Sequence, residues 1–95
     1  MGSVLSEGNT LLRYKDIVLS EETFSPNGLD VMAVPVIDGY KILSVSPWVK
    51  GDWSDKHALI KYHGYLGGYN VSCRNLDSDN SHKWIYGALV LYAKN

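Results

Sequence analysis

The densest group of side chains that could do chemistry lies in the segment Gly51–His57, GDWSDKH, where acid, hydroxyl and imidazole groups are near neighbours. A nucleophilic triad combines these groups, but it needs them to converge on a cleft beside an oxyanion hole, and adjacency in the chain does not provide that. For glycoside hydrolysis, loop carboxylates such as Asp52 and Asp55 would need an apolar pocket to raise one pKa. The sequence indicates no such pocket. We therefore expect no catalytic residue, and a small glycosidase ranks third among the hypotheses.

Metal binding is tested by two patterns. The run Asp77–Ser81, DSDNS, begins like a calcium loop, with oxygen ligands at alternate positions. An EF-hand then needs Gly at its sixth position and Glu at its twelfth, where this chain has His82 and Ala88, so an Asx-rich turn is expected instead. The histidines His57, His63 and His82 show neither HxH nor HExxH spacing, and we interpret each as a loop or surface residue. The sequence predicts neither a metal nor another cofactor.

Aromatic side chains in polar loops are the remaining functional signal. Trp53 stands inside the charged segment, and Tyr65 lies in the glycine-rich run HGYLGGY. Trp and Tyr present flat apolar faces with polar rims, which suit stacking on sugar rings or anchoring a protein contact. With neighbouring polar groups they predict a shallow receptor site. The expected ligand-binding residues are Asp52, Trp53, Asp55, His57, Tyr65, Asp77, Asp79, Asn80 and His82.

The elements that hold these loops should be β-strands, because apolar and β-branched runs of five to ten residues recur between Gly, Pro, Asn and Asp. Asp38-Gly39 joins two such runs and predicts a two-residue hairpin. Pro35 and Pro47 lack a donor for strand pairing, so their strands are expected at sheet edges or at bulges. The predicted strands are Leu11–Leu19, Leu29–Ile37, Tyr40–Val49, Ala58–Tyr62, Tyr69–Asn75 and Lys83–Lys94.

This pattern predicts an all-β, antiparallel β-sandwich that is jelly-roll-like. A short helix or stalk segment within Val4–Leu12 stays open as an alternative. We expect residues 1–20 to form an N-terminal junction with the first strand, and residues 21–95 to form the sandwich. Cys73 alternates with Tyr69 and Val71 and is expected to be a small buried side chain.

Length and charge narrow the classes of partner. The 95 residues suffice for one domain. Nine basic and ten acidic residues are spread along the chain, giving a net charge of −1 without a basic stripe, so no nucleic-acid partner is expected. No run approaches the roughly 18 apolar residues of a membrane span, so no membrane insertion is expected.

The last predicted strand is apolar on both faces. Residues of alternate parity point to opposite sides of a strand, and a strand with one face in water would alternate with polar residues. In so short a chain, a second copy could supply the cover for one face. The candidates for such an oligomer interface are Trp84, Tyr86, Val90 and Tyr92.

From Leu29 onward, about two thirds of the chain carries a series of segments in a definite order. The segment DGYKILSV, residues 38–45, is followed by Trp48 and a polar loop, and the chain closes on LVLYAKN, residues 89–95. These segments resemble the GYKPIGI strand and the VLYVKN ending of the C-terminal head domain of phage tail fibres, also called receptor-binding proteins. This chain departs from the pattern because the segment lacks the family's proline, in whose place Ile42 stands, and lacks the family's second glycine.

The resemblance implies a β-sandwich head at the tip of a tail fibre on the virion, usually trimeric, that binds a bacterial surface saccharide or protein through exposed loops. The leading hypothesis is therefore a non-enzymatic receptor-binding domain that assembles as a homotrimer. The alternative is a structural β module of a virion or surface fibre with no ligand of its own.

Overall fold

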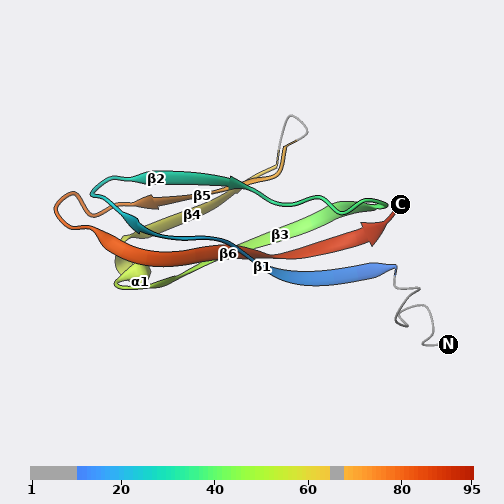
Figure 1. The fold of residues 1–95 in the computed structure, drawn as a ribbon, viewed down its shortest axis with the longest axis horizontal. Helices are drawn as coiled ribbons and strands as arrows, with labels where there is room; N and C mark the ends of the chain where they lie inside the picture. Colours follow the sequence, from blue (N-terminus) through green and yellow to red (C-terminus); the bar gives the residue numbers. More distant parts are fainter. Residues whose placement is uncertain (1–10, 65–67) are drawn as a thin grey trace.

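The computed structural model describes residues 11–64 and 68–95, and these form strands with one short helix (Figure 1). No helix in these described ranges is long and apolar enough to cross a membrane. The strands are β1 (Leu12–Phe24), β2 (Leu29–Ala33), β3 (Tyr40–Gly51), β4 (Ala58–His63), β5 (Asn70–Asn75) and β6 (His82–Lys94), and the helix is α1 (Ser54–His57).

The strands form two antiparallel three-stranded sheets, one in the order β1-β6-β3 and the other in the order β2-β5-β4. The sheets lie over each other as two layers (Figure 1). The predicted all-β sandwich is confirmed, and each predicted strand coincides with an observed one to within a few residues. Pro47 lies on β3, an edge strand, as its missing N–H requires.

Strand β6 is the centre of its sheet and pairs along nearly its whole length with both neighbours. Its register with β1 runs from Leu12↔Ala93 to Phe24↔His82, and its register with β3 runs from Tyr40↔Lys94 to Gly51↔Trp84. The even-numbered side chains from Trp84 to Tyr92 face the second sheet and form the core with Phe24, Val34, Val71 and Cys73.

The four residues expected at an oligomer interface lie in this core. Trp84 is 1% exposed, and Tyr86, Val90 and Tyr92 are fully buried within the single chain. The Tyr86 hydroxyl donates to the Asp30 carboxylate at 2.5 Å, and the Tyr92 hydroxyl donates to the backbone carbonyl of Pro35 at 2.7 Å. The expectation is corrected, because the second sheet of the same chain covers this face of β6.

The turn at Asp38-Gly39 is present, but the predicted hairpin is wrong. Gly39 has a φ of 83°, and the N–H of Tyr40 donates to the carbonyl of Ile37 at 3.0 Å. Strands β2 and β3 nevertheless belong to different sheets, since β2 pairs with β5 and β3 pairs with β6. The turn therefore carries the chain from one layer to the other.

Strand β1 is longer than expected and passes through the proposed boundary at residue 20. It pairs with β6 from Leu12 to Phe24, with a register shift between Val18 and Ser20, so the described residues up to 20 are part of this sheet. The possible helix or stalk within Val4–Leu12 falls almost entirely on residues 1–10, which lie outside the described residues.

The Cys73 thiol should be unreactive in the folded protein. Cys73 is fully buried, as predicted, and burial, reinforced by Asp30 and Glu22, raises the pKa of its thiol to about 11. Since the thiolate is the reactive form, we expect a disulfide reagent such as DTNB to label Cys73 only after unfolding in urea. Rapid stoichiometric labelling in native buffer would contradict this packing.

Gly87 should tolerate no side chain. A Cβ at this position would collide with the Ile17 carbonyl oxygen and would lie 2.7 Å from the Trp48 ring. Overpacking typically costs about 1–3 kcal/mol, and we expect Gly87→Ala to lower the free energy of unfolding by that amount or more. Urea denaturation measures this, with Leu89→Ala, 40% exposed on the same strand, as a milder control. Equal effects of the two substitutions would refute the close approach.

Candidate functional site

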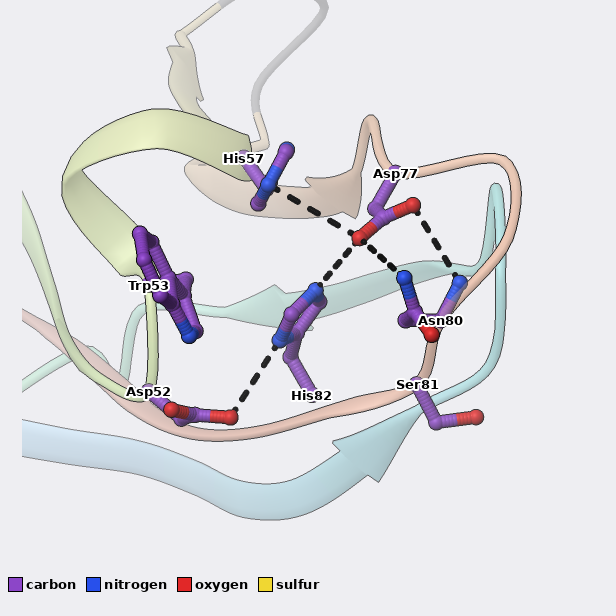
Figure 2. Close-up of a pocket in the computed structure, with 7 residues that line it drawn as sticks. All are labelled: Asp52, Trp53, His57, Asp77, Asn80, Ser81 and His82. Atoms are coloured by element: carbon purple, nitrogen blue, oxygen red, sulfur yellow. Dashed lines mark hydrogen bonds and ion pairs between the residues drawn. The ribbon is translucent and has the colours of Figure 1, made fainter.

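A pocket of about 450 Å³ opens at the end of the sandwich that carries α1. The C-terminus lies at the other end of the long axis (Figure 1). Three segments meet at the pocket: the turn after β3, the helix α1, and the loop that leads from β5 into β6. The lining residues are Asp52, Trp53, His57, Asp77, Asn80, Ser81 and His82 (Figure 2).

The turn after β3 is fixed to the start of β6. Gly51 has a φ of 133°, and a Cβ there would lie 2.6 Å from the carbonyl oxygen of Lys83, so a side chain would be excluded. The indole N–H of Trp84 donates to the Asp52 carbonyl at 2.5 Å. These contacts place Asp52 directly beside the first residues of β6.

Trp53 occupies an unusual backbone position at the start of α1. Its φ of 57° lies in the left-handed region, where a bulky residue is rare. Its carbonyl accepts the N–H groups of Lys56 and His57, which closes the single helical turn. The side chain is 54% exposed, and the Lys56 ammonium lies 5.0 Å from the centre of its ring. Such strain often accompanies functional sites, because surrounding structure must hold it in place.

Asn75 anchors the loop between β5 and β6. Its side chain is fully buried, and its amide donates to the backbone carbonyls of Phe24, Ser25 and Asn80 at 3.3, 3.2 and 2.9 Å. Its amide oxygen accepts the N–H of Asp77 at 2.9 Å. Sequence reasoning missed this role, because Asn75 ends an alternating strand and two of its three acceptors lie about fifty residues away in the chain, at the end of β1.

Asp77 organises the next part of the loop as the predicted Asx-rich turn. Its Oδ1 accepts the backbone N–H groups of Asp79 and Asn80 at 2.9 and 3.2 Å, and its Oδ2 accepts the Asn80 side-chain amide at 3.3 Å. Four hydrogen bonds converge on this carboxylate, the fourth from His82 at 2.8 Å. The orientation of Asp77 is thus set by its own loop.

His82 is buried between two carboxylates, which corrects its interpretation as a loop or surface histidine. It is 6% exposed; its Nε2 lies 2.8 Å from Asp77 Oδ2 and its Nδ1 lies 3.4 Å from Asp52 Oδ2 (Figure 2). Its ring stacks on His57, with centroids 5.1 Å apart, and on Trp84, with centroids 5.5 Å apart. His57 Nε2 in turn lies 3.7 Å from Asp77 Oδ2.

The electrostatics follow from these contacts. The pKa of Asp77 is well below its usual range, chiefly because the backbone N–H of Asp79 and the His82 imidazole stabilise the ionised carboxylate. The pKa of His82 is raised, first by its hydrogen bond to Asp77, with burial opposing the shift and Asp52 adding to it. A protonated His82 donates to both carboxylates at once.

Three of these side chains have the donor atoms of a metal site. Single ligand atoms of His57, Asp77 and His82 all lie within 4.8 Å of one another. Imidazole nitrogen and carboxylate oxygen suit divalent transition metals. The expectation of no metal was based on spacing along the chain, and spacing could not detect this set because its members come from α1, a loop and β6.

The structure gathers most of the predicted binding residues around one pocket. Asp55 is exposed on α1 and does not line the pocket. Asp79 does not line it either, but its backbone N–H donates to the Asp77 carboxylate. Tyr65 lies outside the described residues. Ser81 lines the pocket and was not predicted. The predicted residues that line the pocket are Asp52, Trp53, His57, Asp77, Asn80 and His82.

No family model matches this chain, and neither the curated proteins nor the solved structures provide a match.

Replacing the Asn75 amide should loosen the pocket. Asn75→Asp keeps the shape but removes the donors facing three carbonyls, and each buried unsatisfied group costs about 1–3 kcal/mol. We expect a clearly lower unfolding free energy in urea and faster hydrogen exchange at residues 76–81. The matched control is Asn70→Asp, the same change at the start of β5, outside this network. Similar losses for both variants would show that Asn75 is no special anchor.

The buried His82 should make stability depend on pH in chelator-treated buffer. Asp77, Asp52, His57 and Trp84 face its ring, and the carboxylates raise its folded pKa above the ordinary 6.5. This contribution is complete below pH 6.5 and is lost as the pH rises through the raised pKa. We expect the unfolding free energy to fall over that window in the natural protein and much less in His82→Gln. NMR titration of the imidazole gives the pKa directly, and a value at or below 6.5 would be inconsistent with the geometry.

Proposed function

We propose that the chain is a non-enzymatic receptor-binding module that recognises a bacterial surface saccharide at the Asp52–His82 pocket, defined by the seven lining residues above. The observation that carries this proposal is the exposed indole of Trp53 on the wall of an open pocket whose other lining residues are polar. Indole faces stack on the apolar faces of sugar rings, and polar side chains around them set the orientation of hydroxyl groups.

The polar groups of the pocket suit a polyhydroxylated ligand. The Asp52 side chain is 62% exposed, and Asn80 and Ser81 are also exposed at the rim. Together they offer a carboxylate, an amide and a hydroxyl, which can donate to and accept from neighbouring sugar hydroxyls. The loops beneath are held by Asn75 and Asp77, so little conformational entropy needs to be lost on binding.

The resemblance of residues 29–95 to phage tail fibre heads supplies the biological setting of the proposal. In that setting, the module lies at the tip of a fibre on the virion and acts as a homotrimer. Each shallow site binds weakly, and three sites engaged together on a repetitive cell surface give firm attachment.

Removal of the Trp53 side chain should weaken binding without unfolding the domain. Truncation of an aromatic anchor typically costs about 2 kcal/mol or more, so Trp53→Ala should reduce affinity by at least about tenfold. Glycan arrays and binding to intact bacteria identify the ligand, and calorimetry compares the variants. Val36→Ala, an exposed truncation between β2 and β3, is the control. Binding by Trp53→Ala equal to that of the natural chain would exclude this pocket as the receptor site.

The second candidate function, a structural β module, is favoured by the outer face of the β1-β6-β3 sheet. Tyr14, Val18 and Leu89 are 68%, 57% and 40% exposed there, and their register places them on one side. Light scattering over a dilution series tests assembly, with Val18→Glu as the disrupting variant. A stable trimer that binds no glycan or host cell favours the structural module, whereas glycan binding favours the receptor proposal.

A further inference from the structure

We propose that His57 Nε2, Asp77 Oδ2 and His82 Nε2 form a binding site for a divalent transition metal ion, with Zn²⁺ as its representative. The proposal concerns the metal alone and does not depend on the saccharide function. The metal site goes beyond the saccharide function because its three ligands differ from the groups proposed to contact the sugar. Those groups are Trp53, Asp52, Asn80 and Ser81.

The separations of the donor atoms suit one ion. Asp77 Oδ2 lies 2.8 Å from His82 Nε2 and 3.7 Å from His57 Nε2, and all three donors are within 4.8 Å of one another. Zinc bonds of about 2.0–2.1 Å at tetrahedral angles place ligand atoms roughly 3.3 Å apart. The two distances from Asp77 Oδ2 bracket this value, and the two histidine nitrogens are no more than 4.8 Å apart, so a contraction of the cluster brings all three donors to a common centre.

The contacts behind the ligands match those that hold metal-binding histidines and carboxylates. The far oxygen of Asp77 accepts two backbone N–H groups, those of Asp79 and Asn80, which leaves Oδ2 directed at the histidines. Metal-bound histidine usually donates its other ring N–H to a carboxylate, which fixes the tautomer. Asp52 Oδ2, 3.4 Å from His82 Nδ1, is placed to accept this hydrogen bond. The metal then replaces the proton on Nε2, and His82 becomes neutral, with its remaining proton on Nδ1.

Ring stacking and a backbone hydrogen bond hold the two histidines in place before any ion arrives. Their rings stack with an interplanar angle of 17°. The His57 carbonyl accepts the N–H of Leu76 at 2.8 Å, which ties the end of α1 to the loop that carries Asp77. His82 is further packed on the Trp84 ring. Such preorganisation lowers the entropic cost of closing a site from three separate segments.

The donor set also selects the type of ion. Two imidazoles and one carboxylate suit Zn²⁺ and its transition-metal neighbours, whereas Ca²⁺ typically takes six to eight oxygen ligands. Three protein ligands leave at least one coordination position of a tetrahedral ion for water or another group. That position faces the pocket, because all three ligands are among its lining residues.

The test is calorimetric titration of Zn²⁺ into the full chain after EDTA treatment and dialysis, without saccharide. We expect one ion per chain and no comparable binding of Ca²⁺. His57→Ala should lower the Zn²⁺ affinity by at least about tenfold, because even the loss of a group that only supports a ligand typically costs that much. His57 is the ligand of choice because its side chain is 34% exposed and Asp77 and His82 hold the loop without it. His63→Ala, on β4, is the matched histidine control.

A second substitution tests the supporting carboxylate. Asp52→Asn should weaken the binding of Zn²⁺ by about tenfold, because the neutral amide is a poorer hydrogen-bond acceptor for His82 than the carboxylate. Circular dichroism verifies folding of each variant, and Co²⁺ absorption reports ligand geometry directly. No Zn²⁺ binding, or equal losses in His57→Ala and His63→Ala, would overturn the metal site. Loss of Zn²⁺ binding in His57→Ala with normal binding in His63→Ala would support it, whatever the outcome of the glycan experiments.

Discussion

The pairing of β6 with β1 and β3 is the constraint on which the rest of the structure depends. Both pairings join segments far apart in the chain and extend over nearly the whole strand. They bury one face of β6 against the second sheet and fix its first residues next to the end of β3. Since His82 begins β6 and Asp52 follows β3, the same register that builds the core also brings two pocket residues together.

The pocket is a product of loops that are rigid because their polar groups are satisfied. Asn75 binds three carbonyls, and Asp77 closes the next turn. Every buried side-chain nitrogen and oxygen in the described ranges finds a hydrogen-bond partner. A buried amide with four partners orders its surroundings strongly, because any displacement exposes several unmet hydrogen-bonding groups at once. The exposed indole of Trp53 and the buried imidazole of His82 can then keep fixed positions in the same pocket.

The same pocket serves two proposals that use different groups. Stacking on Trp53 and hydrogen bonds from the rim suit a saccharide, whereas the nitrogen and oxygen donors of His57, Asp77 and His82 suit a metal ion. The two uses are compatible in space, since an ion at the base would still leave the rim exposed. Asp52 is the residue they share, because one of its oxygens faces His82 while most of the side chain is in solvent.

The sequence by itself determined the strands, the all-β class and the turn chemistry, because alternation of side chains and the punctuation by Gly, Pro, Asn and Asp are local properties. It also indicated that Trp53 and the loop aspartates belong together as polar and aromatic surface. Only the tertiary structure decided which strands share a sheet, so the hairpin at Asp38-Gly39 and the interface on Trp84 were wrongly expected. The same holds for Asn75 and for the His57–Asp77–His82 cluster. Their contacts join segments whose separation in the chain carries no periodic signal, and long-range register alone brings them within bonding distance.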